Sequence, residues 1–326
     1  MFDYSKTKKE NITCNLCGSD DFSLLAKKSK NNLPVATVMC RNCSLIYINP
    51  RMTSEDYDNY YKYFYRVDRN TIKGTTTDTR LERNFENARK FGRALGRRYQ
   101  KFFKPGLAVD VGSSTGGVLY GLREALPALK ILGIEPSVAE SELARSRGVP
   151  TKTVLFENFR DVLPEVPANI FCVQSLNHLL DPKGFMAWAY EALTAGGSLF
   201  LAVKNFRHQA RRAGSIEAGV QIDHPYMFTP ETLRAMIESV SFRIVVFEID
   251  EGKSQDELLI QRAEGLPRHH IRVVAVKDNL NKVQVVLPSF WAQLKLRLAL
   301  SWPILKLFYL AKYSHWLTWQ KSKSVV

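Results

Sequence analysis

The chain of 326 residues lacks a long apolar run, since no uncharged stretch approaches the roughly 20 residues that a membrane-spanning helix needs. Its first residues, MFDYSKTKKENIT, likewise contain no apolar stretch of the kind that forms the centre of a secretory signal. We therefore expect a cytoplasmic protein, in a compartment where thiols stay reduced. The hydrophobic content of 45% is ample for a folded core, and the length predicts one large domain with a smaller one.

Acidic residues are scarce relative to basic ones. The formal net charge is +14, and from residue 279 to the end there is no Asp or Glu but seven Lys or Arg. This excess predicts acidic partners, namely nucleic acid, anionic lipid or phosphorylated substrates. Residues 288–320 are also rich in Leu and Trp and contain Pro303, which predicts two basic amphipathic helices lying on the inner face of a membrane. The alternative is a helical hairpin docked on the enzyme or on a second subunit.

Cysteine is rare, but four of the five cysteines form two C-x-x-C pairs: Cys14, Cys17, Cys40 and Cys43. Each pair supplies two thiolates from one tight turn, and two pairs make the tetrahedral set that zinc prefers. Disulfides are the competing interpretation, which a reducing compartment disfavours. We predict a zinc ribbon over residues 10–50, which has too few apolar residues to fold without the metal. Cys172 stands in an apolar run and is expected in the core.

The most informative stretch, residues 106–135, reads GLAVDVGSSTGGVLYGLREALPALKILGIE. An apolar run at 107–111 predicts a buried strand, and the small residues at 112–117 predict a tight turn that a ligand can approach closely. Apolar residues at helical spacing follow over 118–126, and then a second strand ends in an acid, Glu135. Strand, glycine turn, helix, strand and terminal acid form a unit that binds a nucleoside, with the acid on the ribose hydroxyls.

Two ligands suit this unit, a dinucleotide and S-adenosyl-methionine. Asp110 lies just before the turn, where it would repel a pyrophosphate but suit the ammonium of a methionine moiety. The stretch resembles motif I of class I S-adenosyl-methionine-dependent methyltransferases, with Ser114 in place of the middle glycine. That replacement is acceptable if the φ angle of Ser114 is negative. The resemblance implies a set of cofactor-binding residues: Asp110, Gly112, Ser114, Gly116 and Glu135.

The rest of the pattern fits the same fold class, an α/β protein with a Rossmann-like class I methyltransferase sheet, an N-terminal zinc ribbon and a C-terminal basic helical tail. Further strands are predicted near 152–155, 169–174, 198–203, 242–249 and 258–261, and helices over 78–103, 138–147, 185–193 and 230–239. Asp78 is expected to cap the first of these helices. The loop after the third strand meets the adenine in the resembled fold, which makes Glu157 and Asn158 candidates. His269, His270 and Arg272 are expected at the surface.

A second resemblance concerns the N-terminal module. The stretch CNLCGS…CRNCSLIYINPRMTSEDYDNYY resembles the zinc domain of a group of sugar methyltransferases, in which two C-x-x-C pairs precede an apolar strand, Asn-Pro-Arg and an aromatic helix. It implies a sugar substrate. Tyr60 and Tyr61 of the aromatic helix are expected either to contact that substrate or to pack on the next domain.

Two histidines are candidates for a general base. The resemblance places His178, in SLNHLLDP, at a strand tip, and His224, in DHPYMFTPETL, in a lid after the fifth strand. We favour His224 slightly. The alternative is a role in ordering the loop.

The same lid carries Tyr226 and a group of arginines, Arg207, Arg211 and Arg212, that could hold a phosphate or diphosphate. A solvated loop face is the alternative for these arginines.

We thus expect three parts: a zinc-binding domain and linker at 1–72, a methyltransferase domain at 73–265 and a C-terminal extension at 266–326. The predicted function is methyl transfer from S-adenosyl-methionine to a nucleotide-activated or lipid-linked sugar in surface glycan biosynthesis, with Zn²⁺ in the N-terminal module. An RNA methyltransferase and a non-catalytic scaffold are the alternatives. Nucleic acid is the less favoured partner, because the basic charge gathers in a Trp- and Leu-rich tail.

Overall fold

In a computed structural model, the chain folds into two compact units, each made of segments that are distant in sequence. The first comprises Met1–Lys9, Met52–Val203 and Met236–Val285, and the second Glu10–Arg51, Lys204–Ala235 and Val286–Val326. The structure describes residues 2–65, 77–159, 162–267, 270–278, 287–288, 290–301, 303–308 and 310. The division into three parts at residues 72 and 265 stays a prediction.

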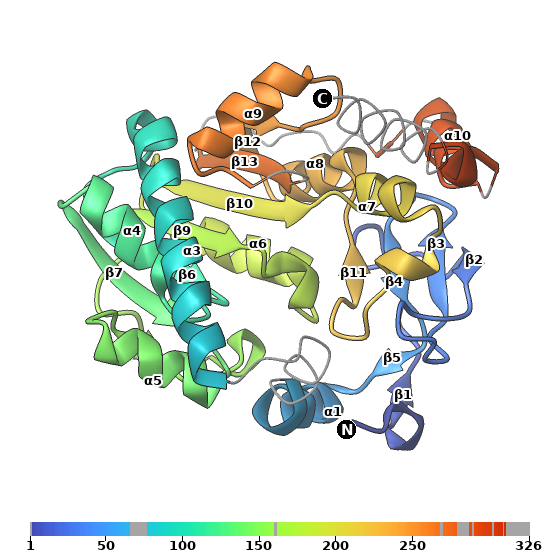
Figure 1. Ribbon diagram of the computed structural model, residues 1–326, viewed down its shortest axis with the longest axis horizontal. Helices are drawn as coiled ribbons and strands as arrows, with labels where there is room; N and C mark the ends of the chain where they lie inside the picture. Colours follow the sequence, from blue (N-terminus) through green and yellow to red (C-terminus); the bar gives the residue numbers. More distant parts are fainter. Residues whose placement is uncertain are drawn as a thin grey trace, which may run out of the picture. The chain divides into compact units, whose positions relative to one another are not determined.

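The first unit is built on a seven-stranded sheet with the order β12-β13-β10-β9-β6-β7-β8 (Figure 1). Its strands are β6 (Gly106–Val111), β7 (Leu129–Ile134), β8 (Thr151–Lys152), β9 (Asn169–Val173), β10 (Ser198–Lys204), β12 (Phe242–Glu248) and β13 (His270–Lys277). The pairs of β6 with β7 and β9, of β7 with β8 and of β9 with β10 are parallel, whereas β12 and β13 are antiparallel. The chain order reverses between β6 and β9, and ligands of open α/β sheets bind outside the carboxyl ends of strands at such a point.

Helices connect these strands and flank the unit. They are η1 (Tyr4–Lys6), α1 (Ser54–Asn59), η2 (Tyr60–Phe64), α3 (Thr77–Tyr99), η3 (Gln100–Phe102), α4 (Gly117–Ala125), α5 (Val138–Ser146), η4 (Phe156–Asn158), η5 (Leu176–His178), α6 (Pro182–Ala192) and α9 (Gln255–Ala263). Helix α8 (Pro230–Glu238) begins in the second unit and ends in the first. The predicted strand, helix and second strand of residues 106–135 are confirmed as β6, α4 and β7, with boundaries within about one residue of those expected.

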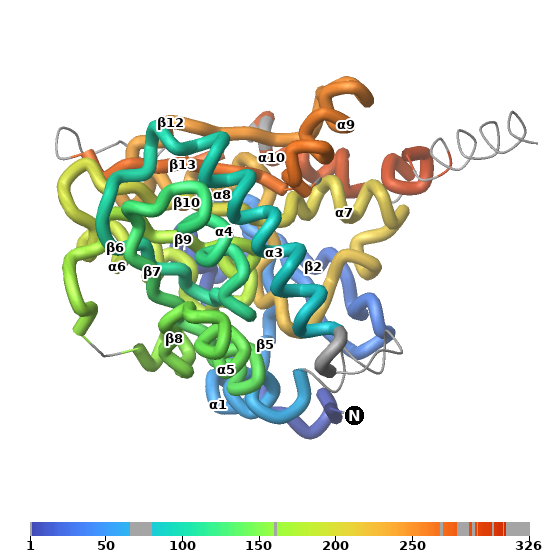
Figure 2. The backbone as a smooth tube through the Cα atoms, turned by 60° about the vertical axis from the view of Figure 1, so that its left-hand side comes forward, coloured from blue at the N-terminus to red at the C-terminus, as the bar shows by residue number. Residues whose placement is uncertain are grey.

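Helices α3 and α4 lie side by side against one face of the sheet (Figures 1 and 2). Glycines make this close approach possible, because a Cβ on Gly92 would collide with the carbonyl of Val118, and one on Gly121 with that of Arg89. The core beneath these helices joins Leu95 and Leu119 to strand residues such as Phe171. The parallel strands are thus shielded from solvent by the helices that cover this face.

Two expectations for this unit are wrong. Residues 258–261 belong to helix α9, whose capping box at Ser254 and Glu257 begins a helix, and β13 supplies the closing strand instead. Arg272 is not at the surface but fully buried, with its Nη2 3.2 Å from Asp250 and its Nε 3.4 Å from Glu248. Two carboxylates compensate the buried guanidinium, which a local pattern around residue 270 cannot reveal.

Smaller differences concern single residues of the same predictions. His270 is buried at the start of β13, and His269 lies outside the described residues. Asp78 is the second residue of α3 rather than its cap.

The second unit contains a four-stranded sheet with the order β11-β4-β3-β2. Its strands are β2 (Phe22–Ala26), β3 (Thr37–Cys40), β4 (Ile46–Ile48) and β11 (Tyr226–Met227), and short strands β1 (Lys9–Glu10) and β5 (Arg51–Met52) pair where the chain crosses between the units. Tyr226 pairs antiparallel with Tyr47, so the lid segment after the fifth strand of the larger sheet adds a strand to the cysteine-bearing module (Figure 1). Helices α7 (Phe206–Ala213) and η6 (Glu217–Gly219) precede β11.

The described part of the C-terminal tail is helical and belongs to the second unit. Helix α10 spans Phe290–Ala299, and residues 303–308 form a further helical stretch that begins at Pro303. Among the described residues, no helix is long and apolar enough to cross a membrane. Residues 311–320 of the predicted helical pair lie outside the described residues.

Candidate functional site

The turn after β6 is held by hydrogen bonds from both neighbouring strands. Gly112 has a φ of +75° and donates its N–H to Ile134 O at 2.8 Å. Its own carbonyl accepts a hydrogen bond from Ser175 Oγ at 2.9 Å. A Cβ at Gly112 would collide with the Ser175 side chain, so only glycine fits here. The turn then leads into α4, with Gly116 in the left-handed conformation at the helix start.

The condition that we set for Ser114, a negative φ, is not met, because its φ is +48°. Two hydrogen bonds hold it in this sparsely populated region: its N–H donates to Glu135 Oε2 and its Oγ donates to Glu140 Oε1, each at 2.8 Å. The serine therefore adopts a left-handed conformation, which glycine adopts most easily, and adds a side-chain bond to α5. Such strain persists only where the surroundings impose it.

Asp110 lies at the carboxyl end of β6 and is almost completely buried. Its pKa is raised to about 8, chiefly by burial; a hydrogen bond from the Val173 N–H opposes this rise, and the nearby Glu135 adds to it. Its Oδ1 has no hydrogen-bond partner among the described residues. A buried carboxyl with an unused acceptor is a suitable partner for the ammonium group of a cofactor.

Glu135 ends β7 and its carboxylate is fixed by two backbone donors, Ser114 N–H at 2.8 Å and Ser137 N–H at 2.9 Å. Each carboxylate oxygen can accept more than one hydrogen bond, so ribose hydroxyls can share it. The structure thus brings Asp110, Ser114 and Glu135 together around one turn.

The two candidates for the adenine loop differ in surroundings. Glu157 accepts a hydrogen bond from the Leu180 N–H at 2.7 Å, which ties η4 to the loop that follows η5. Asn158 is exposed. Their part in cofactor binding stays a prediction.

Sequence reasoning missed two residues that shape the turn, Ser175 and Glu140. Ser175 links the tips of β6 and β9, and Glu140 reaches Ser114 from α5. Ser175 stands directly after Gln174, a non-glycine residue with a φ of +60°. Nothing in the local sequence distinguishes either residue from an ordinary helix or loop position.

His178 lies in η5 and contacts Tyr61 of η2, whose phenol oxygen is 2.9 Å from the imidazole Nδ1. Tyr61 also packs against Tyr60 and Tyr65, with ring centroids 5.6 Å and 5.4 Å apart. The tyrosines of the aromatic helix are therefore packed within the first unit, and one of them contacts the candidate base. Sequence spacing alone could not pair residues that are 117 positions apart.

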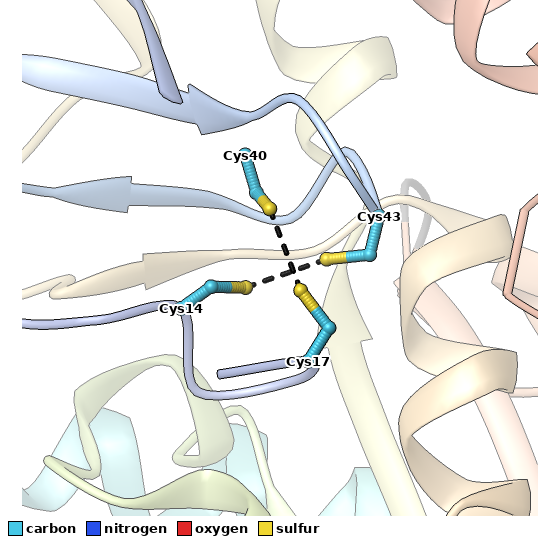
Figure 3. Close-up of side chains that lie close together, drawn as sticks. All are labelled: Cys14, Cys17, Cys40 and Cys43. Carbon is cyan, nitrogen blue, oxygen red and sulfur yellow. Dashed lines mark hydrogen bonds between the residues drawn. The ribbon is translucent and has the colours of Figure 1, made fainter. Parts of the chain in front are cut away.

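The four paired cysteines converge in the second unit (Figure 3). All their Sγ atoms lie within 4.8 Å of one another, with Cys14 and Cys43 3.3 Å apart and Cys17 and Cys40 3.5 Å apart. Four sulfurs around one zinc ion would be separated by about 3.8 Å, as expected for tetrahedral bonds of about 2.3 Å. None of the five cysteines forms a disulfide. Three of the four are fully buried, so the cluster suits a structural metal site closed to solvent.

The remaining candidates lie in the second unit. His224 is buried, and its Nδ1 is 3.4 Å from the Gln221 amide. Tyr226 is also buried and accepts a hydrogen bond from Arg51 Nη1 at 3.3 Å, while Arg51 Nε donates to Glu10 at 2.8 Å.

The arginines of this unit differ in their contacts. Arg207 forms an ion pair with Glu231 at 2.7 Å, and Arg211 lies over the Phe308 ring at 4.7 Å. Arg212 is exposed. The ion pair of Arg207 lowers its availability for a phosphate, and substrate roles for these residues stay predictions.

The family comparison agrees with this site. A family model described as a methyltransferase domain matches residues 81–246, just over half of the chain. The reversal of the sheet order between β6 and β9, with Asp110 just before the glycine turn, agrees with the sheet of a class I methyltransferase. The chain belongs to this methyltransferase domain family and is an S-adenosyl-methionine-dependent methyltransferase.

Solved structures similar to the chain include the plantazolicin methyltransferase BpumL in complex with SAH, with 14% identity over 69% of this chain and 98% of that one, at a TM-score of 0.48. Human N-acetylserotonin methyltransferase in complex with SAM has 17% identity over 59% and 52% of the two chains, at 0.42. A possible histamine N-methyltransferase from Thermotoga maritima has 19% identity over 62% and 96%, at 0.45. No curated protein matches. The family assignment rests on the family model rather than on these similarities.

Proposed function

We propose that the enzyme methylates a sugar, nucleotide-activated or lipid-linked, in surface glycan biosynthesis, and that its second unit holds a structural zinc ion. The observation that supports this most is the continuous motif of two cysteine pairs, Asn49-Pro50-Arg51 and a tyrosine-rich helix, which resembles the zinc domain of sugar methyltransferases. The motif also contributes to the fold. The Asn49 amide oxygen accepts a hydrogen bond from the Ile12 N–H at 3.0 Å, and its amide nitrogen donates one to the Ile12 carbonyl at 3.3 Å.

The cofactor-binding residues proposed here are Asp110, Gly112, Ser114, Gly116 and Glu135, with Glu157 and Asn158 beside the adenine. Bound S-adenosyl-methionine supplies a methyl group already activated on a sulfonium. Because the residues of the turn after β6 are small, the cofactor can approach the backbone there closely. Asp110 binds its ammonium group, and Glu135 accepts hydrogen bonds from its ribose. What remains for the protein is to position the acceptor and remove its proton.

His178 is the proton acceptor that we propose first. In the tautomer whose Nδ1–H donates to the Tyr61 oxygen, Nε2 carries the lone pair and can take a proton from a sugar hydroxyl. Tyr61 then orients the ring and stabilises the imidazolium that forms. His224 is the second candidate for the same role.

Mass spectrometry of the enzyme incubated with S-adenosyl-methionine and a panel of nucleotide sugars tests the proposal. We expect a mass gain of one methyl group on a sugar, lost in His178→Gln and reduced in Tyr61→Phe, because the imidazole loses the partner that orients it. His224→Gln serves as the matched comparison. A parallel incubation with RNA tests the alternative: methylation of the RNA with every sugar unchanged would contradict the sugar assignment. Full activity of His178→Gln would contradict the role of His178 as the proton acceptor.

A further inference from the structure

The C-terminal helices of the second unit are apolar on two opposite faces. On the inner face, Leu296, Leu300 and Leu305 are almost completely buried. On the outer face, Trp291, Leu298 and Leu307 are 72%, 56% and 66% exposed. A helix with apolar residues on opposite faces removes all of them from water only if both faces are covered. The inner face meets this condition within the protein, and the outer face does not.

Specific contacts hold these helices in place in the second unit. Gln293 Nε2 donates to the Asn42 carbonyl at 2.9 Å, and Asn42 lies between the zinc-site residues Cys40 and Cys43. The Arg211 guanidinium lies over the Phe308 ring at 4.7 Å. The outer face therefore belongs to a segment that specific contacts hold in place. Exposed apolar patches of this kind mark interaction sites.

The charge around the outer face selects among partners. Lys295, Arg297 and Lys306 are the charged residues of the described helices, and the sequence from 279 onward contains no acid. A second copy of the same face would bring like charges together, which disfavours a symmetric dimer. Anionic headgroups complement the cations while their acyl chains accept Trp and Leu.

We propose that this outer face binds the surface of an anionic lipid bilayer, with Trp291, Leu298 and Leu307 inserted at headgroup level and Lys295, Arg297 and Lys306 on the lipid phosphates. The helices lie in the interface and do not span it, since the cations interrupt the apolar face. The assignment is independent of the methyl acceptor.

Sedimentation of the full-length protein with phosphatidylglycerol-containing vesicles, and with pure phosphatidylcholine vesicles, tests the proposal. We expect binding to the anionic vesicles that weakens with salt. Trp291→Gln, Leu298→Gln and Leu307→Gln combined should weaken it by about tenfold or more. A second variant, Lys295→Gln with Lys306→Gln, should remove most of the preference for anionic vesicles.

The matched control is Leu259→Gln with Ile260→Gln on α9, two apolar residues that are 55% and 61% exposed but lie beside Asp256 and Glu257. This variant should bind vesicles as the unchanged protein does. Zinc content and cofactor binding, measured for all variants, report that the second and the first unit fold. Failure of the unchanged protein to bind anionic vesicles, or equal binding by the triple variant, would overturn the proposal. So would a dimer in analytical ultracentrifugation that the triple variant dissociates, because the face would then be an interface between copies.

Discussion

The two compact units keep their strands together by different means. In the first, β6, β9 and β10 are buried along nearly their whole length and helices cover the sheet. In the second, strands of two to five residues from distant segments meet beside four converging thiols. The first unit therefore depends on hydrophobic burial, and for the second we propose that ligand bonds to a metal are needed in addition. Predictions that separate these two causes follow, from the largest effect to the smallest.

Removal of a zinc ligand should have the largest effect, and only in the second unit. Cys40→Ser should abolish zinc binding and unfold the module, because structural zinc supplies about 10–16 kcal/mol to folding in small zinc modules. Cofactor binding by the first unit should persist. Zinc content by mass spectrometry and limited proteolysis measure the two outcomes, and Cys172→Ala, at a buried thiol outside the cluster, is the control that keeps the metal. Retained zinc in Cys40→Ser would refute the four-thiolate site.

A methyl group added where α3 and α4 cross should lower the stability of the first unit only. Gly92→Ala places a Cβ against the backbone carbonyl of Val118, which cannot move without displacing the helix. We expect a loss of about 2–3 kcal/mol in the free energy of unfolding, measured by denaturant titration, with zinc content unchanged. Lys90→Ala, exposed on the same helix, should change it by less than about 0.5 kcal/mol. Equal effects of the two variants would contradict the close packing.

Protonation of Asp110 should make cofactor affinity depend on pH. Because burial raises its pKa to about 8, the carboxyl of the free protein is largely neutral below that pH, and a cationic ligand must ionise it. Affinity should rise with pH and level off above about 8, with release of a proton on binding. Calorimetry in buffers of different ionisation enthalpy detects that proton. Asp110→Asn should bind more weakly and without this dependence.

The same shift acts on the stability of the free protein in the opposite direction. A folded-state pKa above the ordinary 3.8 stabilises the fold at acid pH, and this contribution is lost as pH rises towards about 8. The stability gained by Asp110→Asn relative to the unchanged protein should therefore grow over this range. A constant difference across it would show that Asp110 titrates normally.

Changes at Ser114 should have the smallest effect. Ser114→Gly removes the strain of a φ of +48° but also the bond to Glu140, so the two terms nearly cancel, and we expect a stability change below about 1 kcal/mol. Ser114→Ala loses the bond and keeps the strain, and it should be the less stable of the two by about 1 kcal/mol. Thermal unfolding followed by circular dichroism measures the order, and a more stable alanine variant would contradict it.

The sequence determined the parts of the protein whose causes are local. A buried strand, small turn residues and helical spacing predicted β6, α4 and β7, because each pattern reports the burial and backbone freedom of its own segment. The spacing of two cysteine pairs likewise predicted a cluster, since each pair lies in one turn.

Contacts between distant segments were decided only by the tertiary structure. Three features depend on partners that cannot be predicted from neighbouring residues. They are the ion pairs of the buried Arg272 with Asp250 and Glu248, the contact of Tyr61 with His178, and the left-handed conformation of Ser114. Tyr226 similarly pairs with Tyr47, which is distant in the sequence. A local pattern indicates which face of a helix or strand is buried. Which residues it packs against is determined by the tertiary fold of the whole chain.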